Sequence, residues 1–292
     1  MPHFLIADSE TLTEREARRA QAGKSSGETY SVTLKQLSPD CAIDIVQPAD
    51  DDARTFLPDD ITRYDAVFLT GSPLHVYDDT PEVRRQLAFM RAVFASGTPS
   101  FGSCAGLQIA VTAAGGRVRK MPERMEAGIS RRIVATKAGQ GHPMLAGRAD
   151  TWDAPAIHGD EVEELPEGAR LLATNPVTRV QAVEIRHDRG VFWGVQYHPE
   201  LALGEIAVAL QRQADDLVTA GLAESRDDVD TRADQIAALH RKPDERALRW
   251  LLGVDGEFAD EDRRRREIVN FLAELSALDR RRKDSAVPSP AA

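Results

Sequence analysis

The sequence predicts an α/β fold, with a doubly wound, mostly parallel sheet, a small antiparallel β layer and a C-terminal helical appendage. Apolar runs at residues 3–8, 42–46 and 65–70 have the length and composition of buried strands. A helical pattern separates the first two runs, and another helical pattern follows the third. Strands that alternate with helices at this spacing form a parallel sheet whose two faces are covered by helices.

The first half of the chain supplies the elements of this parallel sheet. A helix is expected near residues 28–37, between the first two strands. The polar stretch 9–27 precedes it, and we expect a surface loop with a short helix there, the alternative being a lid over the active edge of the sheet. After the third strand, Pro81 suits a first helical turn, and apolar residues follow at helical spacing: Val83, Leu87, Met90 and Phe94.

The second half of the chain changes character twice. Short β-rich segments separated by turn residues would extend the sheet or form the antiparallel layer, at 131–136, 151–156, 170–174, 179–186 and 190–197. From residue 203 onward apolar residues recur at helical spacing, which predicts a core domain over 1–202, a helical extension over 203–283 and a disordered tail over 284–292. The basic run 263–266 is flanked by acidic residues, so we expect a solvated helix face.

Composition excludes several classes of protein. The 292 residues include 47 Asp plus Glu and 37 Lys plus Arg, a net charge of −10 that makes nucleic acid an unfavourable partner. No apolar window is long enough for a membrane span, and the N-terminus resembles a strand rather than a signal peptide. The two cysteines do not form a disulfide framework, so a cytoplasmic location is expected, with Cys41 a small core residue.

The sharpest local motif is G-S-C-A-G at residues 102–106, between an apolar strand and a helical run. Small residues on both sides of Cys104 permit the tight strand-to-helix turn called a nucleophile elbow. This turn would place the sulfur at a helix N-terminus, which favours the thiolate, and would point the Ala105 N–H at a developing oxyanion. The alternative is a buried structural cysteine in a glycine-rich turn.

A second motif, G-V-Q-Y-H-P-E at residues 194–200, follows another strand. A cysteine nucleophile needs a base, and the base needs a partner that orients it. His198 and Glu200 are two residues apart, so in extended backbone they project to one side. Although a lone histidine is more often structural, this pair together with a cysteine elbow favours catalysis.

A third motif, T-G-S-P at residues 70–73, lies where the third strand ends. Gly71 would let the backbone approach a substrate closely and would supply a second oxyanion donor; the alternative is an ordinary turn. No cofactor is expected, because the sequence has neither zinc-ligand spacing nor a phosphate-binding loop. His142 and His158 are expected to be structural rather than metal ligands.

These three motifs, in this order, resemble the class I (triad) glutamine amidotransferase family, and the overall pattern is similar to the glutaminase portion of GMP synthetase. The resemblance covers about residues 3–202. It implies that Cys104 attacks the γ-carboxamide carbon of glutamine, that His198 moves the proton, and that Glu200 orients the imidazole. It also assigns the oxyanion hole to Gly71 and Ala105 and the substrate pocket to Gln108, Gly128, Ile129 and Ser130.

The resemblance leaves the biological reaction open. Ammonia released from L-glutamine would feed a separate synthase subunit, with the C-terminal helices contacting that subunit or a second copy of the chain. Alternatively, the same triad would hydrolyse an N-substituted γ-glutamyl amide with no partner. The stretch 9–27 and the pair Arg131-Arg132, where many family members have Pro-Val, would fit such a modified pocket. A binding module that has lost activity is a third alternative, which the intact triad disfavours.

Overall fold

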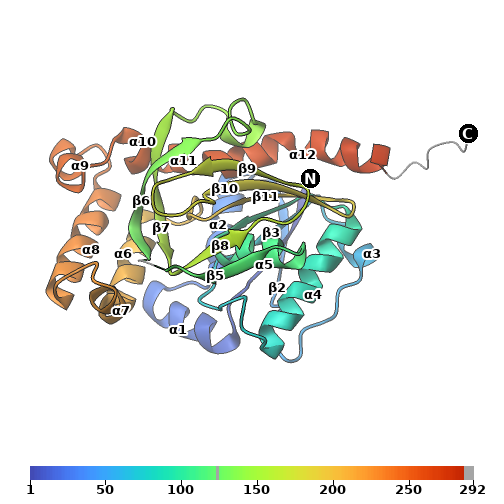
Figure 1. Cartoon of the computed structure of the whole chain (residues 1–292), viewed down its shortest axis with the longest axis horizontal. Helices are drawn as coiled ribbons and strands as arrows, with labels where there is room; N and C mark the ends of the chain where they lie inside the picture. Colours follow the sequence, from blue (N-terminus) through green and yellow to red (C-terminus); the bar gives the residue numbers. More distant parts are fainter. Residues whose placement is uncertain (123–124, 286–292) are drawn as a thin grey trace, which may run out of the picture.

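The structure, a computed structural model, describes residues 1–122 and 125–285. In this part of the chain nine strands form one mixed sheet (Figure 1). Its parallel half contains, from the edge inward, β2 (Ala42–Val46), β1 (His3–Ala7), β3 (Ala66–Leu69), β4 (Ser100–Ser103) and β11 (Gly190–Val195). The antiparallel half continues with β10 (Ala182–His187), β9 (Ala169–Thr174), β6 (Glu126–Ala135) and β7 (Thr151–His158). Two short strands, β5 (Arg117–Lys120) and β8 (Asp160–Glu164), pair with each other apart from this sheet.

Both faces of the parallel half are buried, as the apolar strands predict. Phe4 and Ile6 of β1 belong to a core cluster with helices α2 (Ser26–Leu37) and α12 (Arg266–Ser285). Leu5 and Ala7 point the other way, into a cluster with α4 (Pro81–Ser96) and α5 (Ala105–Ala113). Because alternate side chains of a strand face opposite sides of the sheet, one short strand contributes to both cores.

The order of the strands reverses between β1 and β3. The chain goes from β1 outward to β2 through α2 on one face, and from β3 to β4 through α4 on the other face. In open α/β sheets the crevice at such a switch point, at the carboxyl ends of the strands, is where ligands bind. The loops that follow β1 and β3 therefore meet at the functional edge of the sheet.

The segment after β1 is helical. Helix α1 (Leu12–Ala22) begins with a capping box formed by Thr11 and Glu14, and ends at Gly23 in the left-handed conformation, with φ of 77°. The expected loop with a short helix is thus confirmed in outline, with more helix than loop. In Figure 1, α1 lies next to α6 (Leu203–Arg212), at the same end of the molecule.

Two different cores hold the C-terminal helices. A separate apolar cluster on the hairpin of β6 and β7 is formed by α6, α7 (Ala214–Thr219), α8 (Arg226–Arg241), α9 (Arg246–Leu252) and α10 (Gly256–Ala259). In contrast, α12 packs on the main sheet, where the Phe271 ring contacts Phe68, Phe101 and Trp193. The periodic apolar face of α12 therefore packs on the chain's own sheet. The remaining short helices are α3 (Pro58–Ile61), η1 (Pro143–Leu145) and α11 (Glu261–Arg264).

Most of the predicted elements are confirmed, and the structure differs from the predictions at a few places. Strands β5 and β8 were not predicted, because their charged residues lack a clear apolar alternation. Residues 284 and 285 belong to the last turn of α12 rather than to a disordered tail, and the rest of that tail lies outside the described residues.

The basic run 263–266 is solvated only in part, because Arg263 is exposed while the next two arginines are buried. Arg264 and Arg265 are only 3% and 6% exposed. The Arg264 guanidinium donates to the carbonyls of Phe258 and Ala259, and burial lowers its pKa to about 10. The sequence pattern predicted a solvent-exposed helix face, because no local pattern reveals that another segment covers the end of a helix.

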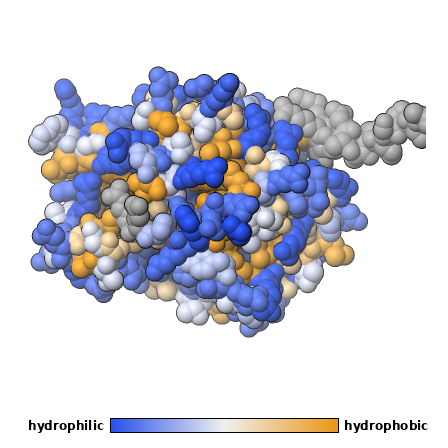
Figure 2. Space-filling view, in the orientation of Figure 1, coloured by the Kyte–Doolittle hydropathy of each residue, from blue (hydrophilic) through white to orange (hydrophobic). Residues whose placement is uncertain are grey.

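The described residues contain no helix long and apolar enough to cross a membrane. Figure 2 shows hydrophilic residues over much of one face of the molecule, with smaller hydrophobic areas among them.

Candidate active site

Cys104 lies in the turn that joins β4 to α5, with φ of 53°. This left-handed conformation is strained for a residue with a side chain and is typical of functional turns. The turn depends on small neighbours: a Cβ on Gly106 would lie 2.5 Å from the Leu69 carbonyl oxygen of β3. The predicted elbow geometry is therefore present, with the Cys104 side chain at the N-terminus of α5.

His198 and Glu200 lie just beyond β11, the parallel neighbour of β4. The His198 Nδ1 is 2.7 Å from the Glu200 Oε1, and the residues are 6% and 3% exposed. The His198 Nε2 and the Glu200 Oε2 are buried, and neither has a hydrogen-bond partner among the described residues. A buried imidazole nitrogen without a partner is unusual, and it is available to a reacting group.

Gly71 lies between this pair and Cys104, the predicted nucleophile. A Cβ on Gly71 would lie 2.8 Å from the His198 Cε1 and 3.7 Å from the Cys104 Cβ. Only glycine fits between the imidazole and the cysteine, so the three predicted motifs converge within one small volume. The Cys104 Sγ also lies 3.9 Å from the Ile157 carbonyl oxygen of β7.

The electrostatics of this volume favour a charged imidazole. Burial by itself lowers the pKa of His198, but the Glu200 carboxylate and the Cys104 sulfur outweigh it and raise this pKa to about 10. The ring is therefore protonated at neutral pH, beside the Cys104 sulfur.

The two backbone N–H groups that were predicted to form an oxyanion hole, those of Gly71 and Ala105, both lie close to Cys104. Ala105 is the first residue of α5, so its N–H has no intrahelical acceptor. The Gly71 N–H also donates no hydrogen bond within the described residues. Both groups adjoin the nucleophile, since Ala105 follows Cys104 in the chain and Gly71 contacts it in space.

The residues that were predicted to bind the substrate lie near Cys104, and their side chains make different contacts. Gln108 is 2% exposed, and its amide donates to the Asp160 carbonyl and to Gln196 Oε1. Gly128 pairs with Ala156, one residue from Ile157, so this part of β6 is one strand away from the nucleophile. The side chains of Ile129 and Ser130 point elsewhere: Ile129 into the helical cluster and Ser130 to Glu126 Oε1.

The sequence analysis did not predict the residues of other helices and strands that contact the proposed triad. The Tyr30 hydroxyl and the Ser103 hydroxyl are 2.7 Å apart beside the nucleophile, and the Thr33 hydroxyl donates to the Glu200 carbonyl. The His198 N–H donates to the Pro155 carbonyl at 2.8 Å. No local signal reveals these contacts, because each joins segments that are distant in the sequence.

Arg131 and Arg132 do not shape the pocket as expected. The Arg131 guanidinium binds Asp153 and the Leu252 and Gly253 carbonyls, so it joins β6 to the end of α9. Arg132, with φ of 53°, lies at a bulge where its N–H donates to Asp153 Oδ1. Arg131 therefore anchors the end of α9, whereas the Arg132 contact lies between β6 and β7.

Cys41 and two histidines are structural. Cys41 is buried just before β2, and its thiol donates to the Leu34 carbonyl. His142 is paired with Glu184, and His158 is paired with Glu126. Within the described residues, no group of His, Cys, Asp and Glu has the arrangement of a metal site.

Comparison with known proteins places this geometry in a family. The model of the class-I glutamine amidotransferase domain matches residues 25–214. A γ-glutamyl-L-1-hydroxyisopropylamide hydrolase of Pseudomonas sp. is 36% identical over 287 residues, an alignment that covers 96% of this chain and 95% of that protein. The chain therefore belongs to the class-I glutamine amidotransferase family, and it is an amidohydrolase.

Other relatives share less of the chain. The glutamine-hydrolysing GMP synthase of Thiobacillus denitrificans is 33% identical over 165 residues, which are 52% of this chain and 28% of the synthase. The crystal structure of a Thermotoga maritima glutamine amidotransferase has a TM-score of 0.61 and 16% identity, covering 94% of this chain and 97% of that one. The structure of a Methylobacillus flagellatus glutamine amidotransferase has a TM-score of 0.56 and 20% identity, covering 87% and 95%. These structural matches confirm the fold class.

Proposed function

We propose that the protein is a stand-alone hydrolase of N-substituted γ-glutamyl amides, with Cys104, His198 and Glu200 as its catalytic triad. The observation that carries the proposal is the alignment with the hydroxyisopropylamide hydrolase along nearly the whole of both chains. The GMP synthases, by contrast, contain a further part of about three quarters of their length that this chain does not match. The triad geometry supplies the chemistry that such a hydrolase needs.

In the first half of the reaction, the Cys104 thiolate attacks the γ-carbonyl carbon of the amide. The carbonyl oxygen becomes an oxyanion between the N–H groups of Gly71 and Ala105. The His198 imidazolium gives its Nε2 proton to the amide nitrogen, the C–N bond breaks, and a free amine leaves. Glu200 holds the ring through Nδ1 and stabilises its charge. The product is a γ-glutamyl thioester on Cys104.

In the second half, the neutral His198 takes a proton from a water molecule. The hydroxide attacks the thioester carbon, the oxyanion forms again in the same place, and the C–S bond breaks. Glutamate leaves, and the Cys104 thiolate opposite imidazolium is restored. The amino-acid end of the substrate would be held by Gln108 and by the backbone at residues 128–130.

The alternative within the same chemistry is a glutaminase that feeds ammonia to a separate synthase subunit, as the match to GMP synthase would suggest. Either reaction is compatible with a cytoplasmic enzyme whose two cysteines are free thiols. An inactive binding module is disfavoured by the convergence of all three motifs.

A steady-state assay of the purified chain tests the proposal. L-Glutamine and a series of γ-glutamyl alkylamides are supplied separately, and released glutamate is measured, with Cys104→Ala as the blank. We expect the alkylamides to be cleaved without a partner, with a kcat/KM above that for L-glutamine. Cleavage of L-glutamine alone would favour a synthase-linked glutaminase, and no cleavage of any amide would favour the binding module.

A further inference from the structure

The segment between β11 and α6 carries His198 and Glu200, and it has no regular secondary structure. Strand β11 ends at Val195 and helix α6 begins at Leu203, so neither a sheet ladder nor a helix fixes the backbone between them. The position of this segment therefore depends on individual contacts from other parts of the chain. The orientation of the imidazole depends on the same contacts.

One of these contacts comes from helix α12. The Tyr197 hydroxyl donates to Glu267 Oε1 at 2.8 Å, and both side chains are fully buried. Tyr197 directly precedes His198 in the chain, and Glu267 lies in the first turn of α12. Burial and the Glu267 carboxylate raise the pKa of Tyr197 well above its usual value, so the hydroxyl keeps its proton and remains a donor.

Glu267 is itself held by a buried arginine. The Arg148 Nε and Nη2 donate to the two carboxylate oxygens of Glu267, each at 2.7 Å, and Nη1 donates to Glu257 Oε1 at 2.6 Å. Burial by itself would lower the pKa of Arg148, but the Glu267 charge outweighs it and raises this pKa above its usual value. A guanidinium that binds both carboxylate oxygens fixes direction as well as distance, so the acceptor of the Tyr197 hydroxyl has one position.

The same arginine leads into the strand that contacts the His198 backbone. Arg148 lies just before β7, and its guanidinium carbon is 5.7 Å from the centre of the Trp152 ring of that strand. Further along β7, the Pro155 carbonyl accepts from the His198 N–H at 2.8 Å. The buried ion pair therefore connects α12 to two groups that hold the histidine, the Tyr197 hydroxyl and the Pro155 carbonyl.

The Glu200 end of the segment is also linked to the beginning of α12. The Thr33 hydroxyl of α2 donates to the Glu200 carbonyl at 3.2 Å. Arg265, the residue before α12, donates through Nη1 to Gln36 Oε1 of α2 at 2.8 Å, and its Nη2 lies 3.5 Å from the Thr33 hydroxyl. The beginning of α12 thus reaches both ends of the segment, directly and through α2.

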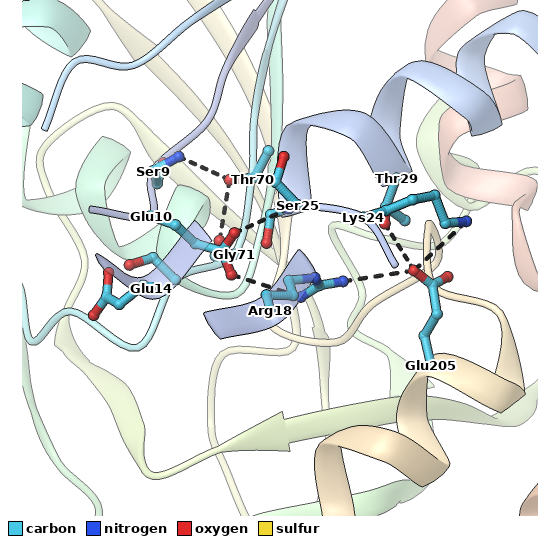
Figure 3. Close-up of polar contacts among 12 residues, drawn as sticks. Ser9, Glu10, Glu14, Arg18, Lys24, Ser25, Thr29, Thr70, Gly71 and Glu205 are labelled. Atoms are coloured by element: carbon cyan, nitrogen blue, oxygen red, sulfur yellow. Dashed lines mark hydrogen bonds and ion pairs between the residues drawn. The ribbon is translucent and has the colours of Figure 1, made fainter. Parts of the chain in front are cut away.

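The oxyanion loop is held by different contacts. The Ser9 N–H donates to the Thr70 hydroxyl at 2.9 Å, and this hydroxyl donates to the Gly71 carbonyl at 3.0 Å (Figure 3). These contacts connect the oxyanion loop to the segment after β1 rather than to α12. A substitution in the α12 contacts should therefore disturb the histidine and leave the oxyanion donors in place.

We infer that Glu267 is a positioning residue for the catalytic histidine and acts through the Tyr197 hydroxyl. The inference rests on the proposed function, in which His198 carries the proton, and it extends that function to the C-terminal helix. The match to the class-I family model ends at residue 214, so α12 lies outside the part of the chain that the model covers. The C-terminal extension therefore contributes to the reaction through the position of His198, in addition to its packing on the sheet.

Tyr197→Phe tests the inference, because it removes the hydroxyl and leaves the Arg148–Glu267 ion pair intact. We expect kcat for a γ-glutamyl amide to fall about 5- to 20-fold with KM within about twofold of the wild type, because the proton carrier is displaced while the substrate contacts are kept. Alkylation of Cys104 at neutral pH, measured without substrate, should slow by a similar factor, since the imidazolium that stabilises the thiolate is less well placed.

The ion pair is tested with the double variant Arg148→Met/Glu267→Leu, because removing both charges together leaves neither of them buried and unpaired. It should lower kcat as much as Tyr197→Phe does. Adding Tyr197→Phe to the double variant should cause no further loss, because the hydroxyl has already lost its acceptor. Independent, multiplying losses would contradict a pathway from Glu267 through Tyr197.

Tyr64→Phe is the matched control, because the Tyr64 hydroxyl also donates to a carboxylate, Asp44 Oδ2 at 2.8 Å, at the opposite end of β3 from the oxyanion loop. It should keep the wild-type kcat and the wild-type alkylation rate. The melting temperature shows whether each variant is folded. A folded Tyr197→Phe that also keeps both rates would reduce Glu267 to a clamp that holds α12 on the sheet, and would overturn the inference.

The alkylation rate separates this inference from the proposed function, because it requires no substrate. If the wild-type enzyme cleaves no N-substituted amide, the proposed function is wrong, while slower alkylation in Tyr197→Phe still supports the positioning of His198. An unchanged alkylation rate in that variant contradicts the inference, whichever amide the enzyme cleaves.

Discussion

Two of the buried histidine–carboxylate pairs in this molecule, His198–Glu200 and His158–Glu126, differ in how completely their polar atoms are hydrogen-bonded. In the first pair, His198 contacts Glu200 at 2.7 Å while the outer nitrogen and the outer oxygen have no partner among the described residues. In the second, the His158 Nε2 contacts Glu126 Oε2 at 3.1 Å and its Nδ1 lies 2.9 Å from the Asp160 carbonyl oxygen. Glu126 also accepts from Ser130, Asn175 and Gln181.

The difference supports the proposal that the first pair is catalytic and the second is structural. The Glu126 hydrogen bonds outweigh the effect of burial and hold the pKa of this carboxyl below its usual value. These contacts join β6 and β7 to Gln181, the residue before β10, although the Gln181 Oε1 has no partner among the described residues. In the His198 pair, by contrast, the imidazole itself keeps one nitrogen without a partner among the described residues, and Glu200 and Cys104 raise its pKa. Four experiments would test this distinction.

The largest loss of activity is expected when Cys104, the proposed nucleophile beside the first pair, is replaced. Cys104→Ala should lower amide hydrolysis by a factor of about 10⁴ or more, because covalent catalysis requires the thiolate. Glutamate release under saturating substrate measures this, and Cys41→Ala is the control that should remain active. Residual activity within about tenfold of the wild type would exclude Cys104 as the nucleophile.

Within the first pair, the two partners should differ in severity. His198→Ala removes the proton carrier and should cost nearly as much as loss of the nucleophile. Glu200→Gln retains a hydrogen-bonding group, so its loss of kcat should be about 10- to 100-fold smaller. Single-turnover kinetics compare the two variants directly. Equal losses would assign Glu200 a further role, such as contact with the substrate.

In the second pair, substitution should affect stability before activity. Glu126→Gln places an amide against two donors, and the free energy of unfolding should fall by about 1–3 kcal/mol. Denaturant titration measures this, and kcat should change less than in either triad variant. Glu163→Gln is the control, because that side chain makes only exposed ion pairs with Arg117 and Arg119. If folded Glu126→Gln were as inactive as Cys104→Ala, Glu126 would have to position the substrate segment of β6.

The smallest expected effect is a displacement of the pH profile. Because the pKa of His198 is raised to about 10, kcat/KM should decline only as the pH approaches that value and the imidazolium loses its proton. The Glu200 charge helps to raise this pKa, so Glu200→Gln should move the alkaline decline to lower pH. Profiles of kcat/KM and of Cys104 alkylation between pH 6 and pH 11 would measure the shift. The unperturbed histidine pKa of about 6.5 is the lower reference for it. An alkaline decline that is unchanged in Glu200→Gln, or that moves to higher pH, would contradict this electrostatic explanation.

The catalytic motifs were predictable because their geometry is local. Small residues on both sides of Cys104 permit the elbow, and the spacing of two between His198 and Glu200 places both side chains on one side of an extended segment. The parallel order of the strands then brings these loops to one edge, which strand and helix periodicity already indicated.

The charged contacts were not predictable from the same patterns. The sequence contains Arg15, Arg18 and Arg19 on one short helix, and nothing in it reveals that each of them pairs with a different carboxylate elsewhere in the chain. The same holds for Arg264 and Arg265, which look solvated in the sequence and are buried in the fold. Such outcomes depend on which distant segment covers each side chain.

The sequence by itself determined the fold class, the positions of the main strands and helices, and the three motifs of the reaction centre, because each rests on backbone periodicity or on spacings of a few residues. Tertiary structure alone decided that α12 packs on the sheet while α6, α8 and α9 form a core of their own. It also decided that β7 supplies carbonyls to the Cys104 sulfur and to the His198 N–H, and that Ser9 donates to Thr70, the neighbour of Gly71. The physical reason is that an apolar stripe or a charge specifies the kind of surface it requires, whereas its actual partner is fixed only when the whole chain packs.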